Sequence, residues 1–549
     1  MPLQKNQVLT LQVERLSSDG SGVAHSPEGE TVFIPGAAPG DEARVRIVKD
    51  CKRYAFGILD EVLTPSPDRI PVDCAVAGPC GGCSLRHLDY VAELRAKQEN
   101  VADAFARIGG LDVPVLPIVG SPEIDRYRNK VQFPVGTDKA GRPCIGFYAG
   151  RTHRIVPCPD CRLQPGVLNE IGNTLCAFFA EKGIHPYNEE TGKGLVRHIF
   201  LRRGAHSGQI MVCLVCTRAK IPSADELCTR LKEAFPDIVT ILLNVNAKNT
   251  NVILGSETHT LYGQGYIEDT LCGVPVQLGP LSFYQVNTLA AEQLYGIAAE
   301  YAQLTPDDLL LDLYCGMGTI GLSMADHCRE LVGVEIVPEA IESAKANAAR
   351  MGAAVSAKSR FFCADAGQAA AQLAAEGLHP DVVMLDPPRK GCDGATLSAV
   401  VRMAPRRVVY VSCNPATAAR DAAWLEQNGY HAEKVQPVDL FPRTKHCETV
   451  VLLSKGEVDS KKIRVEFSLE DMDMSEFQDG ATYPQIKEYV LEHTGLKVSN
   501  LYISQIKRKC GIEVGKNYNL PKSEDSRQPQ CPPEKEKAIR EAFKYFGMI

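Results

Sequence analysis

Leu309-Leu310-Leu311-Asp312-Leu313-Tyr314-Cys315-Gly316-Met317-Gly318 is the stretch that decides the fold of the C-terminal half. An apolar run of this length predicts a buried strand, and the two glycines predict a tight turn into a helix. Further short apolar runs follow, each separated from the next by a helical segment, at residues 330–335, 360–364, 382–386 and 407–411. This alternation predicts a doubly wound α/β sheet of parallel strands.

The glycine turn indicates a nucleotide site at one end of this sheet. Glycine lets the backbone approach a nucleotide closely, and Glu335 ends the second predicted strand, where a carboxylate can bind ribose hydroxyls. A Gly-x-Gly turn is a weak signal and fits a dinucleotide as well. We expect S-adenosylmethionine (SAM) rather than NAD.

Three polar motifs follow the later strands of the predicted sheet. A cysteine is by default a buried packing residue, but Cys413 lies in a polar turn at a strand end, where a thiol can react. Glu448 supplies a carboxylate further on, although an ordinary exposed acid is the alternative interpretation. Cys315 and Cys392 are interpreted as structural. The motifs are Asp386-Pro387-Pro388-Arg389-Lys390-Gly391, Ser412-Cys413-Asn414-Pro415 and His446-Cys447-Glu448-Thr449.

The N-terminal 62 residues predict a compact β unit. About five short strands separated by glycine turns suit a small OB-like barrel. Its glycine pattern resembles that of the TRAM domain, an RNA-binding barrel of RNA-modifying enzymes; a purely structural barrel is the alternative. The residues that carry this resemblance are Gly20-Ser21-Gly22-Val23-Ala24, Val32-Phe33-Ile34-Pro35-Gly36 and Pro39-Gly40-Asp41.

A cysteine cluster follows the barrel as Cys74-x5-Cys80-Gly81-Gly82-Cys83. Three cysteines on a glycine-rich turn predict a metal centre whose fourth ligand comes from elsewhere. The candidates are Cys158 and Cys161, with Cys144 a poorer choice. Structural zinc and a [4Fe–4S] cluster both fit the spacing, and unligated buried thiols are the remaining alternative.

The three motifs together resemble the RNA (uracil-5-)-methyltransferase family, and its iron–sulfur branch acting on 23S ribosomal RNA most of all. The resemblance covers residues 1 to about 455. It implies that Cys413 adds to carbon 6 of a specific uridine and that Glu448 accepts the proton from carbon 5. It also implies that SAM contacts Gln285, Tyr314, Thr319, Glu335, Asp365 and Asp386. The same resemblance implies a [4Fe–4S] cluster, in preference to zinc, with the ligands Cys74, Cys80, Cys83 and Cys161.

This residue set matches what the chemistry needs. Carbon 5 of uracil is a poor nucleophile, and a thiolate that adds to carbon 6 turns the ring into an enolate whose carbon 5 can attack the methyl group of SAM. A base must then remove the carbon 5 proton so that the thiol can leave.

Bulk composition limits the partners. The 549 residues carry a net charge of −7, so any RNA must be bound by local basic surfaces rather than by overall charge. One such run with interleaved aromatics is Arg126-Tyr127-Arg128-Asn129-Lys130-Val131-Gln132-Phe133, in which cations could contact phosphates and aromatics could stack on bases; a solvated strand face is the alternative. No apolar run is long enough for a membrane helix and no secretory signal is present, so we expect a cytoplasmic protein. We also expect a monomer.

Five segments are expected along the chain. They are the barrel (1–62), a central α+β domain with the iron–sulfur cluster (63–278), the SAM-dependent methyltransferase domain (279–455), an acidic linker (456–479) and a helical appendage (480–549). Within the central domain, residues 90–108 predict an amphipathic helix with Val91, Phe105 and Ile108 near one stripe. The appendage, with a basic second helix, could bind nucleic acid, but a packing or protein-contact role is the preferred interpretation.

Competing functions remain open. The same chemistry on transfer RNA is the nearest alternative. A radical or redox iron–sulfur enzyme is another, although the chain lacks the Cys-x3-Cys-x2-Cys spacing of radical SAM enzymes. A non-catalytic RNA-binding protein is the third, and the presence of both Cys413 and Glu448 argues against it.

Overall fold

The computed structural model describes residues 3–150, 152–248, 252–456, 483–494, 496, 498–510 and 531–545. The chain divides into two compact units, Met1–Asp459 and Ser460–Ile549. None of the helices in these described ranges is long and apolar enough to cross a membrane. The predicted acidic linker, from residue 457 onward, lies outside the described residues.

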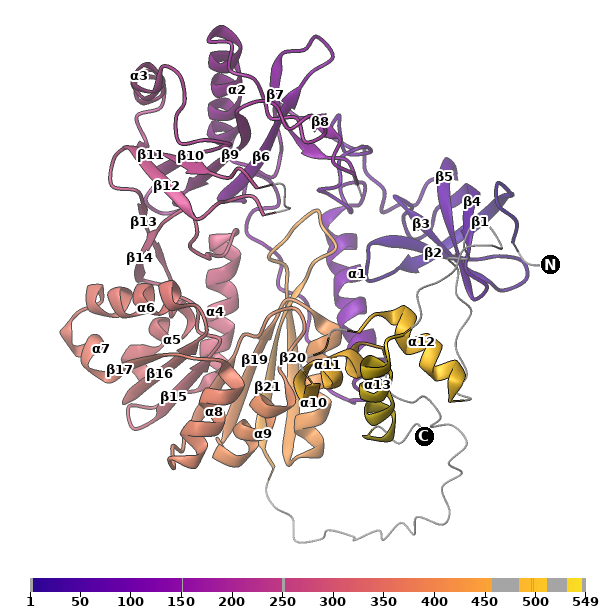
Figure 1. Ribbon diagram of the computed structural model, residues 1–549, viewed down its shortest axis with the longest axis vertical. Coiled ribbons are helices and arrows are strands. Elements are labelled where there is room, and N and C mark those ends of the chain that lie inside the picture. The colour runs from indigo at the N-terminus through magenta and orange to yellow at the C-terminus, as the bar shows by residue number, and fades with distance from the viewer. Residues whose placement is uncertain are drawn as a thin grey trace. The chain divides into compact units, whose positions relative to one another are not determined.

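The N-terminal strands close into a five-stranded barrel, as predicted (Figure 1). Buried and exposed side chains alternate along the first and fourth strands, and the buried set fills the barrel. The strand order is β1-β2-β3-β5-β4, with β1 (Val8–Leu16), β2 (Ser21–His25), β3 (Thr31–Pro35), β4 (Glu42–Asp50) and β5 (Tyr54–Thr64).

A helix, α1 (Tyr90–Asp103), follows the cysteine segment and continues as one π-helical turn, Ala104–Ile108. Phe105 is buried as predicted, but Val91 and Ile108 are 65% and 58% exposed, so the predicted apolar stripe is wrong at both ends. A π-helical turn contains more residues than an α-helical turn, which shifts the residues that face the core. The buried face of α1 is therefore not the one that apolar spacing indicates.

A mixed seven-stranded sheet forms the centre of the first unit, in the order β12-β11-β10-β9-β6-β7-β8. Apolar side chains of this sheet pack against α2 (Gly166–Glu181) and α3 (Ala224–Ala234), and a hairpin, β13 (Ile267–Leu271) and β14 (Val274–Leu278), follows it. The sheet strands are β6 (Lys130–Thr137), β7 (Pro143–Tyr148), β8 (Ile155–Pro157), β9 (Val196–Arg203), β10 (Ile210–Cys216), β11 (Ile238–Val245) and β12 (Glu257–Tyr262).

A second seven-stranded sheet has the order β17-β16-β15-β18-β19-β21-β20. The first five of these strands are parallel, as predicted, and β21 is antiparallel to both of its neighbours. The strands are β15 (Leu309–Leu313), β16 (Glu330–Glu335), β17 (Ser359–Cys363), β18 (Val382–Leu385), β19 (Arg407–Ser412), β20 (Tyr430–Val438) and β21 (Glu448–Lys455).

Helices accompany this sheet along the chain, and separate apolar cores form on its two faces (Figure 1). Leu310 belongs to one core and Leu311 to the other, because successive strand residues point to opposite faces. The helices are α4 (Thr288–Ala302), α5 (Thr319–Ser323), α6 (Pro338–Arg350), α7 (Ala353–Lys358), α8 (Ala366–Ala375), α9 (Gly394–Met403) and α10 (Pro415–Gln427).

The second unit is a small helical bundle with its own apolar core. It contains α11 (Tyr483–Thr494), α12 (Asn500–Lys509) and α13 (Pro533–Tyr545), and Lys509 pairs with Glu536 at 2.6 Å. Ile539 and Phe543 are buried in this core.

Candidate active site and cysteine cavity

The register of two neighbouring strands brings Cys413 and Glu448 together. In the antiparallel pair β19–β21, Val411 lies opposite Val450 and Ser412 opposite Thr449. Cys413 follows the last residue of β19 and Glu448 is the first residue of β21. The charge of Glu448 raises the pKa of Cys413, so the two side chains lie near each other. The two residues are 35 positions apart in the sequence, and the backbone of the sheet holds them together.

Burial and neighbouring charges set the protonation of this pair. Burial raises the pKa of Glu448 to about 8, with a further increase from the negative charge of Asp386 and a decrease from Arg389. Burial also raises the pKa of the Cys413 thiol, as does Glu448, whereas a hydrogen bond from Arg389 opposes the shift. Both groups therefore hold their protons at neutral pH, until a substrate changes their surroundings.

The predicted SAM residues gather at the carboxyl ends of β15, β16 and β18. Glu335 ends β16, and its carboxylate accepts hydrogen bonds from the backbone amides of Gly316 (3.2 Å) and Val337 (3.0 Å). Asp386 follows β18 directly, and burial raises its pKa to about 7. Tyr314 follows β15 with φ +66°, a conformation uncommon outside glycine.

The remaining predicted SAM residues are held by structural contacts. Tyr295 on α4 joins two of them, because its hydroxyl contacts Thr319 Oγ1 at 3.4 Å and the side chain of Gln285. Asp365 caps α8, where its Oδ1 accepts hydrogen bonds from the amides of Gly367 and Gln368, both at 3.1 Å. Among the six predicted SAM residues, Asp365 therefore has a structural role as a helix cap that requires no bound SAM.

Three further residues belong to this site, although the sequence analysis gave them no role. Asp312 accepts a hydrogen bond from the amide of Gly321 at 3.0 Å, and burial raises its pKa to about 8. Arg389 donates to Cys413, and His446 lies close to Arg389. Burial and the surrounding cations lower the pKa of His446 to about 4, so its ring is neutral. Arg389 and His446 stand in the quoted motifs, but their charges can be interpreted only once the strands are paired.

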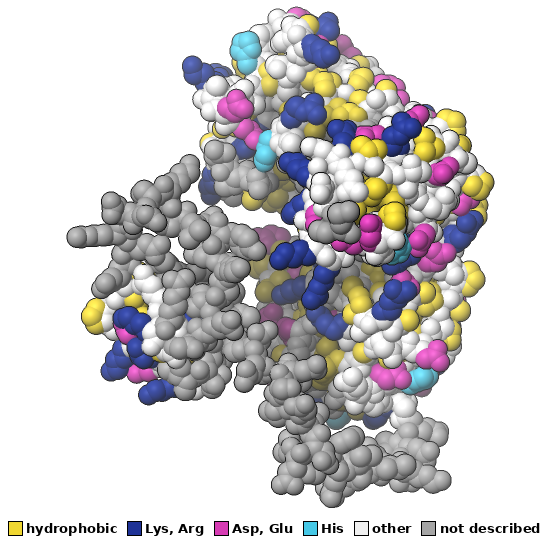
Figure 2. All heavy atoms as spheres, turned by 90° about the vertical axis from the view of Figure 1, so that its right-hand side faces the viewer, with side chains coloured by type: hydrophobic (Ala, Val, Ile, Leu, Met, Phe, Trp, Pro, Cys, Tyr) yellow, Lys and Arg dark blue, Asp and Glu magenta, His cyan; other side chains and the backbone are white. Residues whose placement is uncertain are grey.

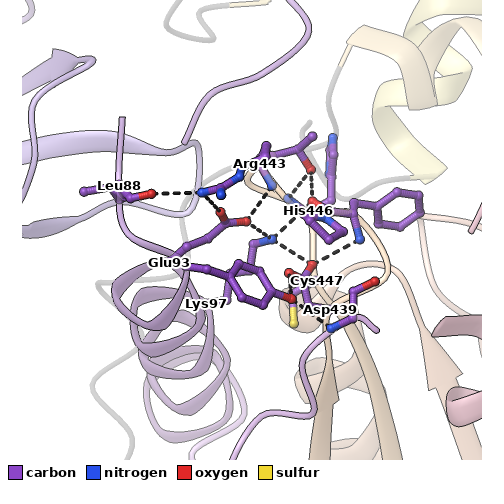
Figure 3. A network of polar contacts seen from close by, with 12 residues as sticks. Leu88, Glu93, Lys97, Asp439, Arg443, His446 and Cys447 are labelled. Atoms are coloured by element: carbon purple, nitrogen blue, oxygen red, sulfur yellow. Dashed lines mark hydrogen bonds and ion pairs between the residues drawn. The ribbon is translucent and has the colours of Figure 1, made fainter. Parts of the chain in front are cut away.

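A buried ion cluster holds the segment that leads to Glu448 (Figure 3). Lys97 Nζ on α1 lies 2.7 Å from Glu93 Oε1 and 2.8 Å from Asp439 Oδ1, and these three side chains are at most 2% exposed. Glu93 also accepts a hydrogen bond from the backbone amide of Arg443 at 2.7 Å. The guanidinium of Arg443 donates to the carbonyl of Leu88 at 2.9 Å. Glu93 and Lys97 are therefore buried ion-pair partners that attach α1 to the segment before β21.

Backbone carbonyls of the same segment are bound from several directions. Asn287 Nδ2 donates to Leu440 O at 3.1 Å, and Tyr127 donates its hydroxyl to Pro442 O at 3.0 Å. The amides of Ser84 and Leu85 donate to Arg443 O at 3.0 and 3.1 Å. Ser84 follows Cys83 directly, so the cysteine segment and the start of β21 are joined through Arg443.

The basic run at residues 126–133 contains side chains that are buried or paired and side chains that line a cavity. Tyr127 and Phe133 are 6% and 0% exposed, so the expectation that its aromatics stack on RNA bases is wrong. Phe133, on β6, packs in the apolar core of the central sheet, and Tyr127, which precedes that strand, donates its hydroxyl to Pro442 O. Arg126 forms a two-point ion pair with Asp160, at 2.6 and 2.9 Å. Arg128 and Lys130 remain as the cations of the run that line an open cavity.

That cavity, of about 290 Å³, is lined by the clustered cysteines. Cys74, Cys80, Cys83, Cys158 and Cys161 all contribute to its wall, and Cys144 does not. Burial raises the pKa of Cys83 to about 11, although Arg86 donates a hydrogen bond to its sulfur. Cys158 donates its thiol hydrogen to Cys161, which lowers the pKa of Cys161 and raises that of Cys158. Within the described part of the chain, no three His, Cys, Asp or Glu side chains are arranged to hold a metal ion.

Comparison with known proteins gives the family. A model described as tRNA (Uracil-5-)-methyltransferase matches residues 276–456, and the TRAM domain model matches residues 2–59. An uncharacterized RNA methyltransferase of Halalkalibacterium halodurans is 43% identical over 453 residues, which cover 82% of this chain and 98% of that protein. The chain belongs to the uracil-5 RNA methyltransferase family. A second relative in this family, from Clostridium tetani, is 41% identical over 454 residues, covering 83% of this chain and 98% of its own.

A solved structure agrees with this assignment. It is the Pyrococcus abyssi tRNA (uracil-54, C5)-methyltransferase in complex with S-adenosyl-L-homocysteine, which is 27% identical, with a TM-score of 0.65. The match covers 81% of this chain and 100% of that one. Gly316, Gly318 and Gly321 have the full spacing of a dinucleotide fingerprint, so the glycines alone do not separate SAM from NAD. Family membership decides for SAM.

Proposed function

We propose that this enzyme methylates carbon 5 of a specific uridine in 23S ribosomal RNA, with Cys413 as nucleophile and Glu448 as base. The observation that supports the proposal is the pairing of β19 with β21, since Cys413 follows the first of these strands directly and the buried Glu448 begins the second. Arg389 and Asp386 complete the charged surroundings of the pair.

The proposed reaction uses this pair in sequence. Cys413 loses its proton to solvent, and its thiolate forms a bond to carbon 6, so that carbon 5 becomes nucleophilic. Carbon 5 then takes the methyl group from SAM, which leaves as S-adenosylhomocysteine. The Glu448 carboxylate removes the carbon 5 proton, the carbon–sulfur bond breaks, and the methylated uridine is released. The positive guanidinium of Arg389 stabilises the thiolate form of Cys413.

The SAM residues of the proposal surround the carboxyl ends of the parallel strands, where ligands of such sheets bind. Glu335 would accept hydrogen bonds from ribose hydroxyls, and its carboxylate is already oriented by two amides. Asp386, Tyr314, Thr319 and Gln285 would line the rest of the site. For Asp365 we propose an indirect contribution, through the position of α8.

Local basic side chains support RNA binding by a chain with a net charge of −7. Lys and Arg side chains gather beside the hollow in the face drawn in Figure 2. Burial, with additional contributions from Arg202 and Arg128, lowers the pKa of Lys130 to about 8. A phosphate near Lys130 would offset the repulsion between these positive charges, so we propose that Arg128 and Lys130 contact phosphates of the RNA backbone.

We further propose that Cys74, Cys80, Cys83 and Cys161 hold a [4Fe–4S] cluster. The donor set fits the group, because thiolates are the usual ligands of such clusters and all four thiols line one cavity. Cys161 rather than Cys158 is the fourth ligand in this proposal, since the hydrogen bond between them favours the thiolate on Cys161. Redox chemistry is not part of the proposed reaction, and the bonds from Ser84 and Leu85 to Arg443 indicate a structural contribution.

The test is methyl transfer from labelled SAM to purified RNA, with protein prepared without oxygen. Wild type should label carbon 5 of a uridine in 23S ribosomal RNA from cells that lack the enzyme. Cys413→Ala should abolish the label, whereas Cys363→Ala, which removes an exposed thiol of the same domain, should retain it. Label that persists in Cys413→Ala would rule out the covalent route.

Transfer RNA is the second candidate substrate. The observation that favours it is the likeness to the Pyrococcus abyssi enzyme, whose name specifies uracil 54 of tRNA. The same assay with unmodified transfer RNA separates the two, because the preferred RNA should show the higher kcat/KM.

A further inference from the structure

A second cavity, of about 600 Å³, lies in the central domain and shares two lining residues with the cysteine cavity. Gly82 and Phe147 line both cavities. The new cavity is bounded by side chains from the end of β7, from the loop after it and from β9. Those used below are Tyr148, His153, Arg197 and His198.

Two buried polar atoms of this cavity have no hydrogen-bond partner among the described residues. They are Nδ1 of His198 and Nε of Arg197, whose residues are 6% and 5% exposed. The other ring nitrogen of His198 is 3.5 Å from the Tyr148 hydroxyl, and Arg197 Nη1 donates to Asn246 O and Lys248 O. A buried polar atom without a partner is costly, and a polar ligand removes that cost.

Aromatic rings occupy the wall beside these polar atoms. The rings of Tyr148 and His153 have their centroids 5.6 Å apart at an interplanar angle of 57°. Burial and the neighbouring Arg197 lower the pKa of His198 to about 4, so its ring is neutral and can donate through one nitrogen and accept through the other. Ring faces next to neutral polar edges are what an unpaired nucleobase requires.

Cationic side chains lie near the proposed nucleophile and near the cysteine cavity. Arg389 contacts Cys413, and the neutral ring of His446 lies near both Arg389 and Arg128. Arg128 and Lys130 line the cysteine cavity, and Phe147 lines both cavities. An RNA strand that led from the target uridine to Tyr148 would have phosphates near Arg389, Arg128 and Lys130.

We propose that the cavity beside Tyr148 and His198 binds an unpaired nucleobase of the RNA substrate, at a position other than the methylated uridine. The proposal rests on the proposed function for the identity of the ligand as RNA. It adds a second point of base recognition, which would fix how far from the target an unpaired base must lie.

Photocrosslinking tests the location. The RNA fragment is prepared with 5-iodouridine at one unpaired position at a time, irradiated with the full-length protein, and the crosslinked peptides are identified by mass spectrometry. One position away from the target should crosslink to Tyr148, His153 or His198. This readout needs no methyl transfer, so it reports on the cavity independently of the reaction. Crosslinks that never reach these residues, while wild type methylates the RNA, overturn the inference and leave the proposed function intact.

Steady-state kinetics test the energetic contribution. Tyr148→Ala should raise the KM for RNA about ten-fold, because loss of a stacked base weakens binding by roughly this factor, with kcat and the KM for SAM within two-fold of wild type. Tyr148→Phe keeps the ring and should have the KM for RNA of wild type. This result would show that the rise in KM for Tyr148→Ala comes from the lost ring. Tyr266→Ala, outside both cavities, is the matched control. An unchanged KM for RNA in Tyr148→Ala, or an equal rise in Tyr148→Phe, would contradict base stacking. No methylation of either RNA by wild type would instead refute the proposed function.

Discussion

The proposed catalytic pair and the cysteine cavity are held in place by different means. Cys413 and Glu448 stand at the ends of two paired strands, so the backbone hydrogen bonds of the sheet set their separation. Cys74, Cys80 and Cys83 lie on a segment outside the helices and named strands, which is held by isolated bridges, hydrogen bonds and ion pairs rather than by a strand ladder.

The two sites therefore depend on different contacts for their rigidity. The catalytic pair is preorganised by the fold and should keep its geometry with or without a ligand. The cysteine segment has little backbone support of its own, so a bound cluster would supply much of its rigidity. The segment 439–443 connects the two, because its carbonyls and charges contact both α1 and the residues after Cys83.

Glu448→Gln should have the largest effect. Without a base at carbon 5, methylation of the ring can proceed but release from Cys413 cannot, so turnover should fall by about 10³-fold or more. The methylated adduct should then accumulate as a protein–RNA complex that survives denaturing electrophoresis.

Cys413→Ala combined with Glu448→Gln is the control for this adduct, since it lacks the sulfur that forms the bond. A complex that persists in the double variant would contradict covalent attachment through Cys413. Fast turnover of Glu448→Gln without any adduct would assign the base to another residue.

Lys97→Met should give the next largest effect, on stability. Removing one partner leaves Glu93 and Asp439 as buried uncompensated carboxylates, which costs about 3–5 kcal/mol in unfolding free energy. Denaturant unfolding measures the loss. Folded Lys97→Met should also accumulate some of the RNA adduct, because the segment that positions Glu448 is loosened.

The neutral triple variant Glu93→Gln, Lys97→Met, Asp439→Asn separates charge from packing. It should recover part of the lost stability, because it buries no unpaired charge. A triple variant less stable than Lys97→Met would mean that the contacts of this cluster matter more than its charge balance.

The parallel strands and the position of Cys413 at the end of one of them could be predicted because apolar runs and turn residues are local signals. The face of α1 could not, since Glu93 and Lys97 have the composition of a solvent-exposed helix and become core residues only through Asp439, more than 300 positions away. Tyr127 was misassigned for the same reason, because its partner is the carbonyl of Pro442. Long-range pairing of polar groups is not encoded in the spacing of either segment.

The cysteine ligands were predictable as a set but not individually. Their types and spacing indicate a metal centre, and the structure adds that Cys158 joins them and that Cys144 does not. Which thiol becomes a thiolate depends on a hydrogen bond between two of them, which no spacing rule contains.

Cys83→Ser tests the proposed cluster in the cysteine cavity, and we expect an effect on stability smaller than that of Lys97→Met. Iron content of the anaerobically purified protein should fall sharply, and the melting temperature should drop by several degrees, because the ligand also orders the segment bound to Arg443. Cys158→Ser is the matched variant and should retain iron, since Cys161 is the proposed ligand. Iron retained by Cys83→Ser, or lost only in Cys158→Ser, would contradict the proposed ligand set.

The pH dependence of stability should show the smallest effect. Because burial raises the pKa of Glu448 to about 8, the folded protein holds a proton there that the unfolded chain releases near pH 4.5. This contribution to stability is therefore complete below about pH 4.5 and lost as the pH rises through 8. Glu448→Gln removes the ionisation, so the stability of the variant should fall less than that of wild type between pH 4 and pH 8.5. Urea unfolding at both pH values measures this, with the exposed Glu300→Gln as control. A stability difference that does not vary with pH would mean that Glu448 is already ionised in the folded protein, and that the sheet tolerates a buried charge beside Cys413.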